Sequence, residues 1–192
     1  INLDDYCMDA EKLQQAITKN TKAILPVHEF GQSADMDKIL EIARENNLLV
    51  IEDAACALGT EYKGKKTGTM GDIGVFSLHP RKAITTGEGG IVVTNNRKIA
   101  ERIKLLRNHG IEFINGKAQF VVPGYNYRMT DFQAAIGCIQ IKKLNYIIEK
   151  RRKLAEEYDR LLANNERIKI PQRENHIYQT YLTAQSILEV LF

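Results

Sequence analysis

Three side chains with different chemistry each stand near the end of a predicted strand. Asp53 follows the apolar run Leu48–Ile51, and Ser77 stands near the end of the run Ile73–Leu78. Lys82 comes five residues after Ser77, in the stretch FSLHPRKAITTGEGG. Because ligands of open parallel sheets bind beyond the carboxyl ends of the strands, we expect these side chains at one site. Pyridoxal 5′-phosphate (PLP) needs such a set: a lysine for its aldehyde, a carboxylate for its pyridine nitrogen and donors for its phosphate.

Each of these residues also has an ordinary structural interpretation. Asp53 would be a helix cap or a solvated carboxylate, although the small apolar residues AACALG that follow it favour a dry environment, where a carboxylate needs a cation. Ser77 would bond the backbone at its strand end, and Lys82 would be a solvated loop lysine. The surroundings of Lys82 favour a bend or a bound ligand, because Pro80 ends a central strand and the glycines of TGEGG permit close approach.

The elements that must position these residues alternate between helix and strand. Helices are predicted at about 9–19, at 35–46, in a segment that ends near 108–110, from Thr130 onward, and at about 146–164. Strands are predicted at 23–27, 48–51, 73–78 and 90–94. Two further strands, at 168–170 and 181–184, are expected in a new sheet. The alternation predicts a parallel sheet. The run Leu48–Ile51 is apolar throughout, which is typical of a strand covered on both faces. Segment 111–124 lacks a pattern and is predicted to be a long loop.

The composition is that of an ordinary globular protein. Of the 192 residues, 44% are hydrophobic and 27% are charged. The net charge of +3 is small and its densest cluster, Lys150–Lys153, is interpreted as a helix face, so no nucleic-acid partner is expected. No apolar run is long enough to cross a membrane, and the N-terminal residues are not a signal peptide. Cys7, Cys56 and Cys138 lack zinc spacing and indicate reduced thiols, hence a cytoplasmic location; the four histidines lie far apart, so no metal site is expected.

Three motifs carry a resemblance to a known family. In this order and spacing, EDAACALG, FSLHPRKAITTGEGG and PGYNYRMTDFQAAIG resemble the DegT/DnrJ/EryC1/StrS family of sugar aminotransferases, and ILPVHEFGQSADMDKI is similar as well. The resemblance runs from about Thr21 to Leu144 and continues more weakly to Ala184. It implies an α/β fold: the large domain of a fold-type I PLP aminotransferase, with a mostly parallel sheet, helices on both faces and the start of a small C-terminal domain.

The resemblance also implies a domain division. Residues 1–145 are expected to be part of the PLP-binding large domain, with its N-terminal portion missing, and residues 146–185 the linking helix and the start of the small domain. Residues 186–192, which include LEVLF, resemble the remnant of a tag or protease site. The absent N-terminal portion would supply a phosphate-binding turn and an aromatic ring that stacks on the cofactor.

Carried over residue by residue, the resemblance implies a role for each site residue. Lys82 matches the lysine that binds the PLP aldehyde, Asp53 the carboxylate that pairs with the pyridine nitrogen, and Ser77 a ligand of the phosphate. Asn126 matches an asparagine that reaches the phosphate bound by the other subunit, which implies a homodimer with shared active sites. Arg128 is predicted to hold an anionic substrate group, or else to form a structural ion pair.

One position departs from the family pattern, and another separates two branches. Family members often carry Gln or His against the cofactor ring three residues after the aspartate, where this chain has Cys56. A thiol is a weak hydrogen-bonding group, so the ring contact is weakened, or Cys56 is only a small packing residue. Some relatives replace the cofactor lysine with histidine and dehydrate a keto-deoxysugar. Lys82 stands at that position here and His79 does not, which favours transamination.

The implied function is PLP-dependent transfer of an amino group from L-glutamate to a nucleotide-linked keto-deoxysugar, for surface polysaccharide or glycoside biosynthesis. The motifs do not select the sugar, its carbon or its nucleotide. The alternative is a non-catalytic, self-associating fragment of such an enzyme without bound cofactor. A generic phosphate-binding protein is a third interpretation, but the glycine-rich stretches GTMGDIG and GEGG are neither a P-loop nor a GxGxxG fingerprint.

Overall fold

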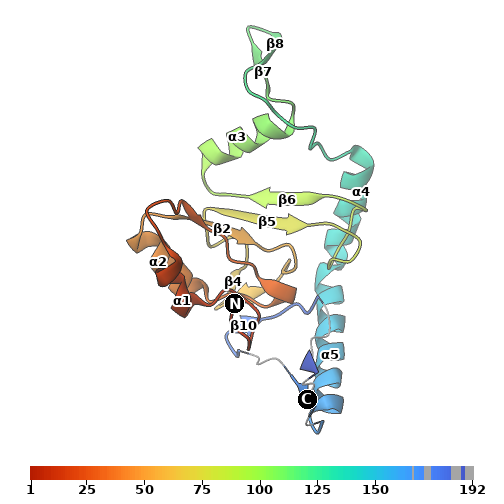
Figure 1. The fold of residues 1–192 in the computed structure, drawn as a ribbon. Helices are drawn as coiled ribbons and strands as arrows, with labels where there is room; N and C mark the ends of the chain where they lie inside the picture. Colours follow the sequence, from red (N-terminus) through yellow and green to blue (C-terminus); the bar gives the residue numbers. More distant parts are fainter. Residues whose placement is uncertain (166, 171–173, 183–186, 189–192) are drawn as a thin grey trace.

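The computed structural model of the chain describes residues 1–165, 167–170, 174–182 and 187–188 (Figure 1). Its helices are α1 (Ala10–Ala16), α2 (Met36–Glu45), α3 (Arg97–Arg107), α4 (Asp131–Gln140) and α5 (Leu144–Leu162), with short 3-10 helices at Glu29–Gly31 and Ile141–Lys143. Its strands are β1 (Ala23–Ile24), β2 (Leu49–Asp53), β3 (Glu61–Tyr62), β4 (Lys65–Lys66), β5 (Ile73–Ser77), β6 (Gly90–Val93), β7 (Ile111–Ile114), β8 (Lys117–Phe120), β9 (Ile168–Lys169), β10 (Ile177–Tyr178) and β11 (Ile187–Leu188).

A four-stranded sheet forms the centre, in the order β1-β2-β5-β6. The β1–β2 and β2–β5 pairs are parallel, and β6 is antiparallel to β5. The register places Asp53 opposite Val75 and Ser77 opposite Gly90. The prediction of an α/β fold with a mostly parallel sheet is therefore confirmed. Asp53 is the last residue of β2 rather than the residue after the strand, because its backbone still bonds Pro26 and His28 beyond β1 and it pairs in register with Val75 of β5.

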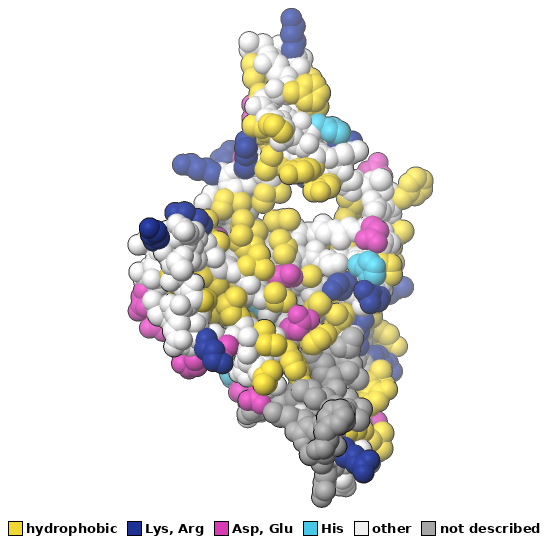
Figure 2. Space-filling model, in the orientation of Figure 1, with side chains coloured by type: hydrophobic (Ala, Val, Ile, Leu, Met, Phe, Trp, Pro, Cys, Tyr) yellow, Lys and Arg dark blue, Asp and Glu magenta, His cyan; other side chains and the backbone are white. Residues whose placement is uncertain are grey.

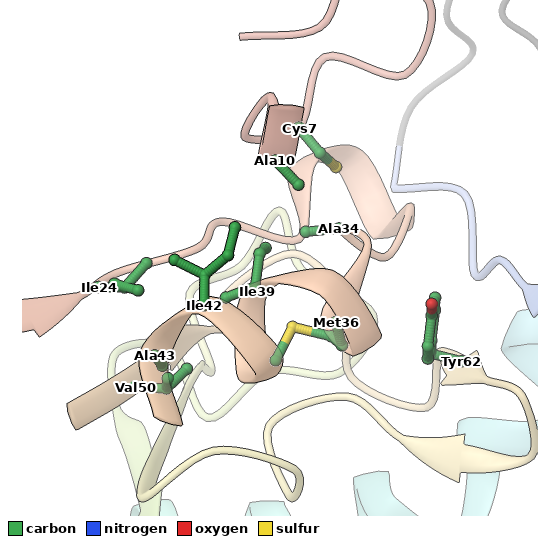
Figure 3. Packing of buried hydrophobic residues seen from close by; sticks show 10 residues of the cluster. All are labelled: Cys7, Ala10, Ile24, Ala34, Met36, Ile39, Ile42, Ala43, Val50 and Tyr62. Carbon is green, nitrogen blue, oxygen red and sulfur yellow. The ribbon is translucent and has the colours of Figure 1, made fainter. Parts of the chain in front are cut away.

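The described core lies between α2 and the first two strands (Figure 3). Ile39 and Ile42 of α2 are buried together with Ile24 of β1 and Val50 of β2. Successive strand residues point to opposite faces, so the side chain of Leu49 points away from this core and is 50% exposed. Within the described residues, the prediction that the 48–51 run is covered on both faces is therefore wrong.

The C-terminal part begins with a long helical stretch that passes the ends of β5 and β6 and contacts the segment that follows β5 (Figure 1). Thr130 caps the N-terminus of α4, as predicted. Its side chain accepts a hydrogen bond from the backbone N–H of Gln133 in a capping box. The predicted strand near 168–170 is confirmed as β9, which pairs with β11 in a separate sheet. The prediction for 181–184 is wrong at 181 and 182, which lie outside any strand, and 183 and 184 are outside the described residues. The strand lies at β10 instead, because its backbone pairs with β3.

The segment predicted as a loop contains a β-hairpin. Strands β7 and β8 pair antiparallel and project from the body of the molecule (Figure 1). Asn115 and Gly116 connect them, both with positive φ, as a two-residue type I′ turn requires. Phe113 and Phe120 on this hairpin are 76% and 77% exposed. The loop prediction is therefore wrong for residues 111–120, where Asn-Gly between two short strands is a hairpin signal, whereas residues 121–124 lie outside any strand or helix, as predicted.

Gly74 offers a test of how β5 is held in place. A Cβ atom added to Gly74 would lie 1.9 Å from the backbone oxygen of Gly68, in the loop before β5. We expect Gly74→Ala to destabilise the chain by about 3 kcal/mol or more, because two backbone segments would have to separate. Urea unfolding measures this. The matched control is Gly137→Ala in α4, whose added Cβ would meet only the Thr86 methyl group at 3.2 Å; equal stability of the two variants would contradict the packing described.

Candidate active site

Asp53 presents its carboxylate at the end of β2 while its backbone is held on the β1 side. Its N–H donates to the Pro26 carbonyl at 2.9 Å, and its carbonyl accepts from the His28 N–H at 2.9 Å. One carboxylate oxygen, Oδ1, accepts from the Ala55 N–H at 3.0 Å. The side chain is half-buried, and no described residue bonds its second oxygen, Oδ2. Asp53 therefore offers a fixed acceptor at the strand end.

Lys82 lies in the turn that follows β5. Its N–H donates to the His79 carbonyl at 2.9 Å, and its own carbonyl accepts from Arg151 Nη2 of α5 at 3.1 Å. The half-buried side chain places Nζ 3.0 Å from Sγ of Cys56, three residues after Asp53. The structure thus brings the amine to the loop that leaves β2, while both backbone groups of Lys82 are occupied.

Ser77 ends β5, the strand that lies parallel and adjacent to β2. Its Oγ accepts from the His79 N–H at 3.3 Å, which leaves the hydroxyl hydrogen able to donate to an anion. Ser77 is half-buried, two residues beyond the partner of Asp53 in the register. The predicted carboxylate, hydroxyl and amine therefore come from neighbouring strand ends and the turn that follows.

Cys56 contributes a free, half-buried thiol to this group. Its described partner is Lys82, so the residue does more than fill space. A sulfur contact is weak compared with the amide or imidazole expected at this position. Its predicted contact with a cofactor ring stays a prediction.

Asn126 and Arg128 lie apart from this group in the chain. Both are exposed and follow the β7–β8 hairpin, where Asn126 forms a bridge with Asn108 at the end of α3. Arg128 Nη1 donates to the Asn108 side chain at 3.2 Å, a neutral partner rather than the carboxylate of an ion pair. None of the described hydrogen bonds joins them to Lys82, Asp53 or Ser77. Their roles toward a second subunit and a substrate stay predictions.

Three functional candidates were not predicted from the sequence. Arg151 belongs to the cluster interpreted as a helix face, but it is half-buried and holds the Lys82 carbonyl; burial lowers the pKa of its guanidinium. His28 and Glu52 are fully buried and bonded to each other. Burial raises the pKa of Glu52, whereas the hydrogen bonds from His28 and from backbone amides lower it. The lowering is the larger of the two effects, so the net shift of the pKa is downward. His28 belongs to the motif PVHEF and Glu52 to the motif EDAACALG, and this position inside the motifs was the sequence signal that could have identified them.

Neither a metal site nor a membrane-spanning helix is present in the described ranges. No group of three or more His, Cys, Asp or Glu side chains there is placed to hold a metal ion. Every helix in those ranges is too short or too polar to cross a bilayer.

Comparisons with known proteins relate the chain to one family. The model of the DegT/DnrJ/EryC1/StrS aminotransferase family matches residues 1–188. GDP-perosamine synthase of Caulobacter vibrioides is 49% identical over 158 residues, which cover 82% of this chain and 42% of that protein. UDP-4-amino-4,6-dideoxy-N-acetyl-beta-L-altrosamine transaminase of Campylobacter jejuni is 43% identical, covering 84% of this chain and 44% of that protein.

Solved structures agree with this relation. The PLP-form of Spr1654 from Streptococcus pneumoniae superposes with a TM-score of 0.90 and is 26% identical. The match covers 99% of this chain and 54% of that chain. The chain spans about half the length of the curated relatives it matches.

Proposed function

Because the chain belongs to the DegT/DnrJ/EryC1/StrS aminotransferase family, we propose that the whole protein is a PLP-dependent aminotransferase. Its reaction transfers an amino group from L-glutamate to a nucleotide-linked keto-deoxysugar. Two matched relatives, a GDP-perosamine synthase and a UDP-aminosugar transaminase, support this substrate class. The products enter surface polysaccharides or glycosides, and the reaction takes place in the cytoplasm, in keeping with three free thiols.

The observation that carries the proposal is the approach of the Lys82 amine to Cys56, in the loop that follows β2. The donor set fits PLP: an amine for its aldehyde, a carboxylate for its ring nitrogen and a hydroxyl for its phosphate come from Lys82, Asp53 and Ser77. Cys56 lies between Asp53 and Lys82 in the sequence, and its thiol offers only a weak contact with the cofactor ring. When bound, PLP supplies an electron sink that makes the C–H bond of the amino donor acidic.

Each residue of the proposed site has its own role. Lys82 binds the cofactor at rest, and its amine, when released, moves a proton between the substrate carbon and the cofactor carbon as general base and acid. Asp53 holds a proton on the ring nitrogen, and that positive charge offsets part of the cost of desolvating the carboxylate. Ser77 donates its hydroxyl hydrogen to a phosphate oxygen. Arg151 keeps the Lys82 backbone in place from α5.

The remaining assignments complete the proposal. Asn126 reaches the phosphate in a second subunit of a homodimer, and Arg128 binds an anionic group of the substrate; their exposure and position beyond the hairpin support both roles. Residues 1–145 belong to the large domain, and 146–185 form the linking helix and the start of the small domain.

Covalent labelling tests the function directly. The whole protein is mixed with PLP, reduced with borohydride and digested, and the labelled peptide is identified by mass spectrometry. We expect the label on Lys82 and on no other lysine, because this amine is held at the strand ends. A label spread over exposed lysines, or none at all, would contradict the proposed function.

Exposed apolar side chains favour a second proposal, for the 192-residue chain by itself. Leu25, Leu49, Ile91 and Val92 of the central sheet region are all more than a third exposed. Figure 2 shows hydrophobic side chains gathered over the same region. Such a surface favours self-association without turnover or bound cofactor. Light scattering with and without PLP separates the two: a colourless oligomer supports this proposal, and a yellow protein labelled at Lys82 supports catalysis.

A further inference from the structure

The Glu52 carboxylate lies in the interior with no exposed surface and receives four hydrogen-bond donors. His28 Nε2 lies 2.9 Å from Oε2, and the Gly68 amide donates to the same oxygen at 2.7 Å. The amides of Met70 and Gly71 each donate to Oε1 at 2.6 Å. Among the described residues, no Lys or Arg side chain pairs with Glu52, and its side-chain partner is His28.

The hydrogen bonds of His28 define its protonation state. The Ala34 N–H donates to Nδ1 at 3.2 Å, so Nδ1 carries no proton and the ring proton lies on Nε2, facing Glu52. His28 is therefore neutral, and Glu52 keeps a full negative charge stabilised by N–H groups. A buried charge without a cation is costly, and apolar residues at such a position are often as stable. Stability alone therefore does not explain the pair.

The pair is bonded to segments on both sides of the proposed site. The backbone N–H of His28 donates to the Asp53 carbonyl, so the residue that binds Glu52 by its side chain also holds Asp53 by its backbone. On the other side, the three amides bonded to Glu52 belong to residues 68–71, the loop before β5. Gly68 of that loop lies against the Phe76 ring, next to Ser77.

We propose that Glu52 and His28 form a positioning pair that fixes Asp53 and the 68–71 loop, and thereby holds the Asp53 carboxylate at the ring nitrogen of PLP. The part that concerns PLP rests on the proposed function. The pair touches neither substrate nor cofactor; it acts through the backbone of β2 and of the segment after β1.

Four variants of the whole protein test the pair. Glu52→Gln removes the charge, His28→Leu removes the donor, and His28→Gln retains a donor near the Nε2 position. Val50→Ala is the matched control, since Val50 is a buried residue of the same strand and face but makes no side-chain hydrogen bond. Hydrogen exchange at the His28 and Asp53 amides is measured without cofactor, the PLP dissociation constant by absorbance titration, and the absorbance of bound PLP against pH.

Glu52→Gln and His28→Leu are expected to speed exchange at both amides and to raise the PLP dissociation constant about tenfold, the size of one lost charge-assisted hydrogen bond. They are also expected to shift the pH at which bound PLP changes absorbance, which a general loss of stability does not do. His28→Gln and Val50→Ala are expected to stay within about threefold of the wild type, because neither removes a donor from Glu52.

Equal PLP affinity in Glu52→Gln and Val50→Ala, or in His28→Leu and His28→Gln, would overturn the positioning pair. If Glu52→Gln does not fold, the two His28 variants provide the same comparison with the carboxylate intact. If the wild type carries no PLP on Lys82, the proposed function fails, whereas the exchange of the Asp53 amide still decides whether the pair holds this residue.

Discussion

Lys82→Ala is expected to remove both the covalent PLP label and the proposed aminotransferase activity of the whole protein. The variant loses the amine that the structure places 3.0 Å from Cys56 Sγ, in the loop after β2. Loss of the general acid and base alone lowers a rate by about 10²–10⁴-fold, and loss of cofactor attachment adds to this. The measurement is a single turnover with glutamate, followed by the absorbance of the cofactor.

Two controls separate the chemistry of Lys82 from its effect on folding. Lys65→Ala removes an exposed lysine of β4 and is expected to leave the rate unchanged. Added methylamine is expected to restore part of the rate of Lys82→Ala, because a small free amine can enter the vacated space and carry the proton. Near-normal turnover of Lys82→Ala without added amine would show that another group does this chemistry.

The fold was predictable where local patterns repeat. Helix–strand alternation and apolar runs gave the parallel sheet, and Thr130 marked the start of α4 because capping depends on residues close in sequence. The hairpin at 111–120 was not predicted although Asn115-Gly116 signals it, since each strand has only four residues and its apolar side chains, such as Phe113 and Phe120, are exposed instead of joining the core. Exposure of Leu49 was not predictable, because an apolar run does not show which neighbours cover it.

The candidate site was predictable only in part, for a physical reason. Residues at strand ends are found from sequence because the sheet brings the ends together. The contact between Lys82 and Cys56 joins residues 26 apart, and Arg151 reaches Lys82 from 69 residues away. Such contacts depend on tertiary packing, which no local pattern encodes. The burial of Glu52 was not predictable for the same reason, because sequence alone does not distinguish a buried carboxylate from a surface one until its hydrogen-bond donors are known.

Asp53 is expected to be the second most sensitive residue of the site. Asp53→Ala removes the acceptor at the end of β2, so under the proposed function the ring nitrogen of bound PLP loses its counter-charge and its proton. Removal of a charge placed to stabilise a reacting centre costs about 10²–10³-fold in rate. Asp53→Glu is expected to retain more activity than Asp53→Ala, because the carboxylate stays within reach of the nitrogen.

The neutral variant Asp53→Asn shows whether charge or packing is responsible. It preserves the size of the side chain and an acceptor for the Ala55 amide but cannot hold a proton on the nitrogen, so its rate is expected to resemble that of Asp53→Ala. A PLP analogue methylated on the ring nitrogen carries a fixed positive charge and is expected to recover part of the activity of Asp53→Ala, where the missing carboxylate leaves room. Wild-type rates in Asp53→Asn would exclude the proposed ion pair, because this variant keeps the size of the side chain but has no negative charge.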